Sequence, residues 1–144
     1  MSNTPPKRIA QFDGQYRFLS NFSDHPVTYA GLTFKNSEAA FHAMKCPSRA
    51  AEFTELSPSQ AKQLGRKVKL RLDWETVKDA IMHDIVKAKF SQDDELRVCL
   101  LSTGDAYLEE GNTWGDRYWG TVDGVGKNML GKILMQVRDE LFKG

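Results

Sequence analysis

Apolar residues recur at helical spacing through two long stretches of the chain. Between Asp73 and Ser91, and again after Asn128, they fall three or four positions apart, the period of a helix with one wide buried face. These positions are Trp74, Val77, Ile81, Met82, Ile85, Val86, Ala88 and Phe90 in the first stretch, and Leu130, Ile133, Leu134, Val137 and Leu141 in the second. We therefore expect two long helices, the first of them central to the core.

Polar caps and helix-ending residues predict four shorter helices between residues 36 and 104. Asn36-Ser37 can cap a helix that runs to Lys45 and ends before Pro47. A second short helix is expected over residues 50–56. Ser57-Pro58, a cap followed by proline, begins a third that ends at Gly65. Acidic residues 93–95 begin a fourth, which Gly104 stops.

Residues 9–34 have the texture of strands and turns instead. Asp13-Gly14 and Ala30-Gly31 are turn signals, so we expect two short hairpin arms. Tyr107-Leu108 predicts one more short extended piece. The predicted fold class is mainly α, a compact single-domain helical fold of about six helices with a small β-hairpin element near the N-terminus. Residues 1–8, which include Pro5 and Pro6, predict a disordered tail, and residues 9–144 predict one domain.

Composition and charge narrow the functional class of the protein but do not decide it. The chain has 144 residues, 40% of them apolar and 27% charged, with a net charge of +1. This near-neutral balance gives no strong case for nucleic acid or membrane binding, although a local basic groove stays open. Two cysteines are too few for a disulfide framework, so we expect buried thiols in a reducing compartment. The start lacks a signal-peptide core, and no run is apolar enough to cross a membrane, which favours a cytoplasmic location.

The most unusual composition lies between Gly111 and Gly131. This stretch contains Trp114 and Trp119, two of the three tryptophans, and six of the eleven glycines. A loop rich in tryptophan is costly to expose, and a loop rich in glycine is costly to order. We expect it to form half of an active site, with the helix that begins near Glu38 as the other half.

Two carboxylates are the candidate catalytic groups, and each has a structural alternative. Glu38 lies in the first turn of its predicted helix, where an acidic side chain can simply stabilise the helix through a favourable interaction with its dipole. It shares a face with Phe41, however, which suits a partly desolvated carboxylate to acid–base work. Asp116 is flanked by Trp114, Tyr118 and Trp119. It can be an Asx-turn residue, or a carboxylate that stabilises a cation between aromatic walls.

Basic residues offer a possible phosphate site. Lys62, Arg66, Lys67, Lys69 and Arg71 give five positive charges and no negative one between Ser57 and Leu72. They can form a solvated face or bind phosphate. Gly124-Val125-Gly126-Lys127 precedes a helix start, where backbone N–H groups can also hold phosphate, but the Walker A spacing is absent.

Metal and nucleophile patterns are weak. Glu38 and His42 are four apart, a thin start for a metal site, and His25 and His83 complete no known ligand motif. Cys46, beside Lys45, makes a faint case for a reactive thiolate. We expect no metal and no cofactor.

Taken together, the motifs resemble the NADAR (NAD- and ADP-ribose-associated) family, whose bacterial members are similar to an N-glycosidase that clears riboflavin-pathway intermediates. The resemblance covers residues 9–142. It rests on Phe18-Leu19-Ser20-Asn21-Phe22, Asn36-Ser37-Glu38 with Phe41 and Lys45, Ala61-Lys62 with Leu64-Gly65-Arg66, Arg71 with Asp73-Trp74, Lys87-Ala88-Lys89-Phe90, Asn112 with Trp114-Gly115-Asp116, Tyr118-Trp119-Gly120, and Gly126-Lys127-Asn128.

The resemblance implies a mainly helical hydrolase of N-glycosidic bonds, with Glu38 and Asp116 as its catalytic carboxylates. We expect the substrate to be bound by Asn21, Lys45, Arg66, Lys69, Trp74, Asn112, Trp114, Trp119, Lys127 and Asn128. Many relatives have His-Tyr after the motif glutamate and Gln after the motif phenylalanine. Here these positions are Ala39-Ala40 and His42, so the substrate preference can differ.

The expected partner is a small phosphoribosyl or ADP-ribosyl compound, either a riboflavin-pathway intermediate or ADP-ribose on guanine in nucleic acid. A non-catalytic ADP-ribose or nucleotide-binding module is the alternative. Two carboxylates near the ligand argue against that module, because a pure phosphate binder would avoid them.

Overall fold

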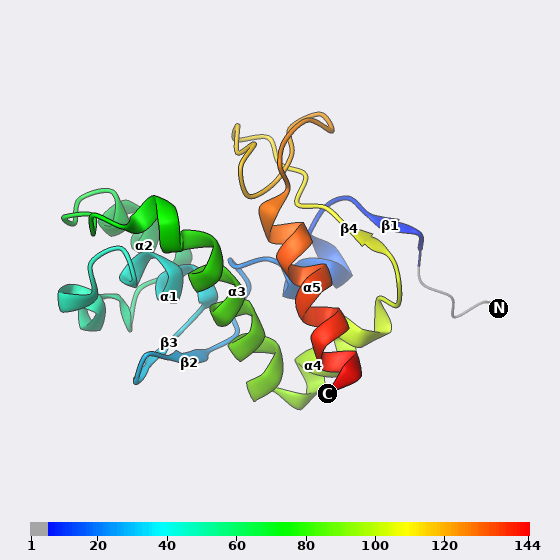
Figure 1. Ribbon diagram of the computed structural model, residues 1–144, viewed down its shortest axis with the longest axis horizontal. Helices are drawn as coiled ribbons and strands as arrows, with labels where there is room; N and C mark the ends of the chain where they lie inside the picture. Colours follow the sequence, from blue (N-terminus) through cyan, green and yellow to red (C-terminus); the bar gives the residue numbers. More distant parts are fainter. Residues whose placement is uncertain (1–5) are drawn as a thin grey trace. The chain divides into compact units, whose positions relative to one another are not determined.

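The computed structural model describes residues 6–144, and it is mainly helical (Figure 1). The α-helices are α1 (Ser37–Ala43), α2 (Pro58–Gly65), α3 (Trp74–Gln92), α4 (Asp94–Ser102) and α5 (Met129–Lys143). Two 3₁₀ helices are η1 (Gly14–Leu19) and η2 (Pro47–Phe53). The strands are β1 (Arg8–Ile9), β2 (Val27–Tyr29), β3 (Leu32–Phe34) and β4 (Tyr107–Leu108). The expected mainly α fold with a small β-hairpin is confirmed.

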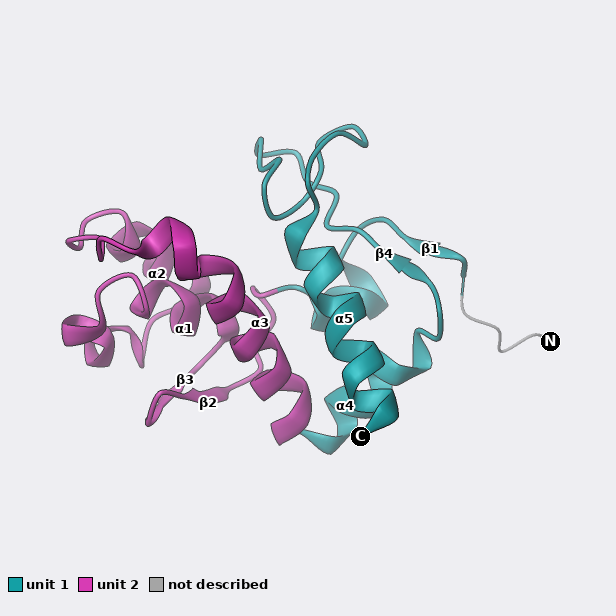
Figure 2. Cartoon of the chain, viewed as in Figure 1, with its two compact units in different colours: residues 1–20, 93–144 teal, residues 21–92 magenta. Residues whose placement is uncertain are grey.

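The described chain divides into two compact units (Figure 2). Unit 2 is the continuous segment Asn21–Gln92. Unit 1 combines residues 6–20 with Asp93–Gly144, so it is built from both ends of the chain. The two carboxylates predicted to be catalytic fall in different units, Glu38 in unit 2 and Asp116 in unit 1.

Unit 2 is built around the short helix α1, which packs against α2, η2 and α3. Six of its seven residues are buried, and its small Ala39, Ala40 and Ala43 side chains are fully enclosed. Small side chains let neighbouring elements approach closely. Glu38 is the exception, since it is only partly covered. The burial of α1 therefore fixes the direction of the one carboxylate it carries.

The β2–β3 hairpin also belongs to unit 2, and its turn matches the prediction. Ala30 and Gly31 both have positive φ, as a two-residue hairpin turn requires. The hairpin is tied to the end of α3, because the Gln92 side chain donates to Thr28 O at 2.7 Å and accepts from Thr28 N at 2.9 Å.

Side-chain caps explain where the helices begin. Asn36 accepts a hydrogen bond from Ala39 N at 2.8 Å and so caps α1. Ser57 and Gln60 form a reciprocal capping box at α2, with Pro58 in the first turn. Asp93 accepts from Leu96 N at 3.1 Å and caps α4. The caps at Asn36 and Ser57 lie where the sequence predicted them, and Asp93 lies in the acidic run that was expected to begin α4.

In unit 1, α5 packs against α4 and β4, and β4 pairs in parallel with β1. Leu130, Leu134 and Val137 of α5 are fully buried, and so is Leu108 of β4. The long loop between β4 and α5 carries the tryptophan- and glycine-rich stretch.

Three details of the prediction were wrong. Asp13-Gly14 does not form a hairpin, because Gly14 instead begins the 3₁₀ helix η1. The helix expected over residues 50–56 is the 3₁₀ helix η2, which starts three positions earlier at Pro47, a residue suited to a helix start. Cys46 and Cys99 are free thiols, and both are half-buried rather than buried.

The predicted disordered tail falls mostly on residues 1–5, outside the described residues. Within it, Arg8 belongs to β1. Across residues 6–144, every helix is either too short or too polar to cross a bilayer.

Candidate active site

The Glu38 carboxylate is held by its own helix. Its side chain is 13% exposed, and Oε2 lies 2.9 Å from His42 Nε2 one turn later. The backbone N of Glu38 donates to Asn21 O at 3.2 Å. Oε1 makes no hydrogen bond within residues 6–144. One carboxylate oxygen is therefore fixed by protein, and the other is available to a ligand.

A lysine and a tryptophan lie near this carboxylate. Lys45 Nζ lies 5.8 Å from the centre of the Trp74 ring, and Trp74 packs on Phe41 with ring centres 5.0 Å apart. Burial lowers the pKa of Lys45, while the negative charge of Glu38 opposes that shift. Glu38, Lys45 and Trp74, three of the predicted site residues, thus form one group in unit 2.

Only some of the basic residues between Lys62 and Arg71 act on this group. Positive charges on Arg66 and Lys62 add to the lowering of the Lys45 pKa, so both act on the Glu38 side of unit 2. Arg71 has a different role, because its guanidinium binds Asp73 at 2.6 Å and 3.1 Å. Lys69 is exposed, and nothing in the described structure ties it to the carboxylate.

Asn21, predicted to bind substrate, has a clear structural role. It is buried, its Oδ1 accepts from Ser37 Oγ at 3.0 Å, and its Nδ2 contacts Met82 Sδ at 3.4 Å. Its side chain therefore positions the start of α1, and with it Glu38.

Asp116 organises the tryptophan-rich loop of unit 1. Its Oδ1 accepts from Tyr118 N at 3.0 Å and from Trp119 N at 2.9 Å. This is the Asx-turn geometry that the sequence offered as the structural alternative. Oδ2 makes no hydrogen bond within the described chain, and the residue is half-buried. The structural and chemical roles are compatible, because they use different oxygens.

Asn112 holds the same loop together from inside. Its Nδ2 donates to Asp116 O at 2.9 Å and Thr121 O at 3.1 Å, and its Oδ1 accepts from Asp116 N at 3.0 Å. Only 8% of the residue is exposed. Like Asn21, it supports a carboxylate and has its own polar atoms occupied by protein.

The aromatic residues of this loop differ in exposure. Trp114 is 62% exposed, which is unusual for an indole. Trp119 is half-buried and packs edge-on against Tyr118 at 4.9 Å. Lys127 Nζ lies 5.1 Å from the centre of the Tyr118 ring. Of the predicted wall residues, Trp114 therefore offers the larger free face.

Asn128 lies at the predicted start of the last helix. It has a left-handed φ of 53° and makes no capping bond to α5. Its side chain instead accepts from Glu110 N at 3.0 Å and donates to Leu108 O at 2.9 Å. It is 1% exposed, so its role is to join the loop to β4.

The predicted site residues thus gather in two groups. Glu38, Lys45, Trp74 and Arg66 belong to unit 2, and Asp116, Trp114, Trp119 and Lys127 belong to unit 1. The expectation that Glu38 and Asp116 meet stays a prediction.

His42 is a functional candidate to which the sequence analysis assigned no role. Its spacing from Glu38 was interpreted as a thin metal motif, whereas the structure shows a direct hydrogen bond between the two side chains. Residues 6–144 contain no group of three His, Cys, Asp or Glu side chains arranged to hold a metal. The four-residue spacing on a helix was the available signal.

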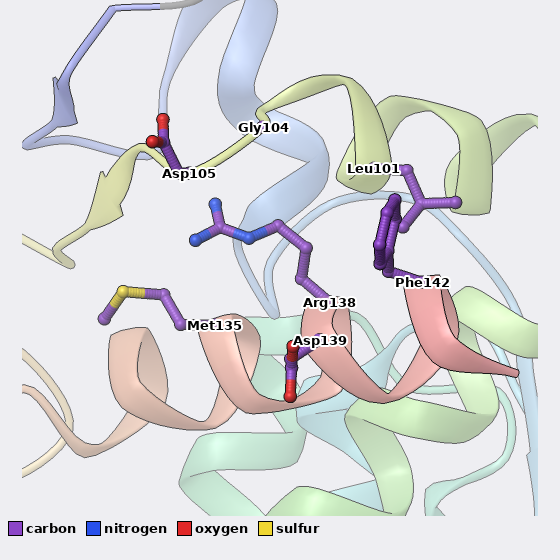
Figure 3. A pocket seen from close by; sticks show the side chains of 7 residues that line it. All are labelled: Leu101, Gly104, Asp105, Met135, Arg138, Asp139 and Phe142. Atoms are coloured by element: carbon purple, nitrogen blue, oxygen red, sulfur yellow. The ribbon is translucent and has the colours of Figure 1, made fainter.

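A separate cavity of about 370 Å³ lies in unit 1, and none of the predicted site residues lines it (Figure 3). Its wall is made by Leu101, Gly104, Asp105, Met135, Arg138, Asp139 and Phe142. Burial lowers the pKa of Arg138, and the charges of Asp105 and Asp139 oppose that shift. Arg138 also donates to Thr103 Oγ1 at 2.9 Å, which fixes its guanidinium.

Comparison with known proteins shows which family the chain belongs to. The model of the NADAR domain matches residues 9–142, almost the entire chain. The chain belongs to the NADAR family. This NADAR protein is 40% identical over 132 residues to N-glycosidase YbiA of Escherichia coli (strain K12), covering 88% of this chain and 82% of that one.

A solved structure and one further relative extend the comparison. The NMR structure of E. coli YbiA matches with a TM-score of 0.81 and 35% identity, over 99% of this NADAR protein and 94% of YbiA. The riboflavin biosynthesis protein VVA0006 of Vibrio vulnificus is 36% identical over 135 residues. That match covers 90% of this chain but only 36% of the Vibrio protein. This protein is thus a homologue of N-glycosidases, and another of its relatives is named for riboflavin biosynthesis.

Proposed function

We propose that this NADAR protein is an N-glycosidase that hydrolyses the C–N bond between a base and a phosphorylated ribose. The observation that carries the proposal is the Glu38 carboxylate, almost buried, fixed through one oxygen by His42 and accompanied by Lys45 and Trp74. Similarity to N-glycosidase YbiA over most of both chains supports the same reaction class.

The chemistry matches these residues. As the base leaves, positive charge develops on the ribose ring, and a nearby carboxylate stabilises it. The same carboxylate can take a proton from the attacking water. Glu38 has an oxygen available for either task. Asp116 has its Oδ2 available too, and we assign the two carboxylates jointly to the reacting carbon, the ribose hydroxyls and the leaving base.

Binding of the phosphate falls to the basic residues near Glu38. Lys45, Arg66 and Lys62 bring positive charge to the Glu38 side of unit 2, and charge-assisted bonds to phosphate are strong. Lys69 and Lys127 are exposed and serve as additional phosphate ligands in this proposal. Trp114, with its open face, would stack on the base or the sugar.

Homology with N-glycosidases implies a nucleotide-type small-molecule substrate. We propose a phosphorylated ribosylamino intermediate of riboflavin synthesis, because a relative carries that pathway in its name, and a cytoplasmic location to match. ADP-ribosylated guanine in nucleic acid is the competing substrate. Affinity for single-stranded DNA that falls steeply with salt would favour that competitor.

The test is incubation with a panel of N-ribosyl phosphates and ADP-ribosyl compounds, with release of free base followed by mass spectrometry. Glu38→Gln and Asp116→Asn should each lower kcat by roughly 10²–10⁴-fold. Glu75→Gln is the matched control, because Glu75 also lies in the first turn of a helix but its side chain is 78% exposed. Near-native turnover in both test variants would overturn the assignment.

The non-catalytic alternative has a distinct outcome. Tight calorimetric binding of ADP-ribose, with no base released over hours by the wild-type protein, would make the chain a nucleotide-binding module and overturn the proposed hydrolysis.

A further inference from the structure

The His42 ring sits in an enclosed and asymmetric environment. The residue is 7% exposed, and Nε2 contacts the Glu38 carboxylate at 2.9 Å. Nδ1 is buried and has no hydrogen-bond partner among the described residues. Buried polar atoms are nearly always paired, so this unpaired nitrogen requires a physical account.

Gly65 supplies that account. It is the last residue of α2, and a Cβ at this position would lie 2.5 Å from Nδ1 and 3.0 Å from Cγ of His42. The α2 backbone therefore lies directly against the Nδ1 edge of the ring, and only glycine leaves room for it. Nδ1 thus faces carbon, with neither a donor nor an acceptor beside it.

This asymmetry decides where the ring proton sits. A proton on Nδ1 would bury an N–H group without an acceptor, which costs about 1–3 kcal/mol. It would also point the Nε2 lone pair at the carboxylate. A proton on Nε2 instead makes a charge-assisted hydrogen bond to Glu38, and the unpaired Nδ1 is then an acceptor that faces no lone pair. A doubly protonated ring would again bury the unpaired Nδ1–H group.

We propose that His42 is a positioning residue for Glu38, held as the neutral tautomer with its proton on Nε2, so that Glu38 works as an ionised carboxylate. This inference rests on the proposed function for its catalytic part. It gives Glu38 the work that needs negative charge, which is stabilising the ribosyl cation or accepting a proton from water. Protonation of the leaving base then falls to another group.

The charges around the pair are consistent with this assignment. Lys45, two residues beyond the end of α1, interacts favourably with the Glu38 charge, and the charges of Lys62 in α2 and of Arg66 just after it also act on Lys45. Positive charges interact favourably with a carboxylate and unfavourably with an imidazolium ring. The α3 side contributes the neutral Trp74 ring.

The tautomer can be measured without any substrate. Long-range ¹H–¹⁵N correlation spectra of histidine-labelled protein distinguish a bare imidazole nitrogen from a protonated one. We expect His42 near neutral pH to show a proton on Nε2 and a bare Nδ1. A proton on Nδ1, or on both nitrogens, would overturn the proposal.

Kinetics test the positioning role. His42→Leu removes the hydrogen bond and should lower kcat by about 10–100-fold with KM changed only a few-fold, because orientation is lost while the phosphate contacts stay. His42→Gln keeps an N–H donor and should recover most of kcat. Gly65→Ala displaces the ring from its place and should resemble His42→Leu, with thermal melting reporting any general loss of folding.

Equal loss in His42→Gln and His42→Leu, or unchanged kcat in His42→Leu, would overturn the positioning role. Failure of the proposed function is distinguishable, because it would appear as an inactive wild-type protein whose His42 spectrum still shows the Nε2 tautomer.

Discussion

The Asp116 side chain contributes in two ways, through its hydrogen bonds and through its negative charge, and substitutions can separate the two. Its Oδ1 shapes the loop through two backbone N–H groups, whereas its negative charge is what the proposed chemistry needs. Asparagine keeps the accepting oxygen and removes the charge. Alanine removes both.

We therefore expect the free energy of unfolding of Asp116→Asn to lie within about 0.5 kcal/mol of the wild-type value. For Asp116→Ala we expect it to be lower than wild type by about 1–2 kcal/mol. Urea titration measures both. In activity assays the two variants should be similarly impaired, because both lack the charge. An asparagine variant as unstable as the alanine variant would show that the charge, and not the hydrogen bonds, holds the loop.

The three predicted substrate amides show how far single residues could be interpreted from sequence. Asn21, Asn112 and Asn128 were expected to bind substrate, yet each is buried with its side chain bonded to protein. A motif marks these residues as specific but does not say whether the amide faces a ligand or the backbone. That distinction depends on contacts between residues distant in sequence, which only the folded chain provides.

At the scale of elements, the capping box of α2 is a local device with a measurable effect. Ser57→Ala removes the bond to Gln60 N and should destabilise the protein by about 1 kcal/mol. Ser59→Ala is the matched control, since Ser59 lies exposed within the same helix and should change stability little. Thermal or urea unfolding compares the two. Equal effects would mean that the cap does not limit the stability of α2.

Elements set by local chemistry were predicted well, and those set by distant partners were not. Asn36 and Ser57 cap their helices where expected, and α4 begins in the expected acidic run, because a helix start involves only neighbouring residues. Asp13-Gly14 was misread because a turn signal becomes a hairpin only if a partner strand follows. Residues 14–19 instead close on themselves as a 3₁₀ helix. The parallel pairing of β1 with β4 was not foreseen, since it joins segments from opposite ends of the sequence.

At the scale of the whole molecule, the buried lysine of α3 should make stability depend on pH. Lys89 is 1% exposed, its Nζ donates to Ser23 Oγ at 3.0 Å, and burial lowers its pKa from 10.5 to about 7. In the unfolded chain, Lys89 keeps its proton up to its ordinary pKa of 10.5. At pH values between about 7 and 10.5, unfolding therefore takes up a proton. Stability therefore increases as pH rises from about 7 toward 10.

We expect this one residue to add about 2 kcal/mol to the free energy of unfolding between about pH 7 and about pH 9. Urea unfolding across that range measures the slope, and Lys89→Met should remove it. A slope that is the same in wild type and Lys89→Met would assign the pH dependence to other groups.

The active-site hypothesis also makes a prediction about the whole molecule, namely that Glu38 and Asp116 approach each other. Cysteines at these two positions, with Cys46 and Cys99 changed to serine, should be joined by a short bis-maleimide, and mass spectrometry would identify the linked peptides. Each single-cysteine variant is the control. Two cysteines that both react with a monofunctional maleimide but never join would contradict a shared site.

The pairing of β1 with β4 also constrains how the chain matures on the ribosome. Arg8 bonds Glu109, 101 positions later, so the first strand waits for most of the chain to be made. At about 5–20 residues per second this delay is on the order of 5–20 seconds. All of residues 21–92 are made within that interval. Ile9, which is 3% exposed in the folded protein, still lacks its partner strand during that time. The pairing of β1 with β4 therefore cannot form before residues 107–109 have been made.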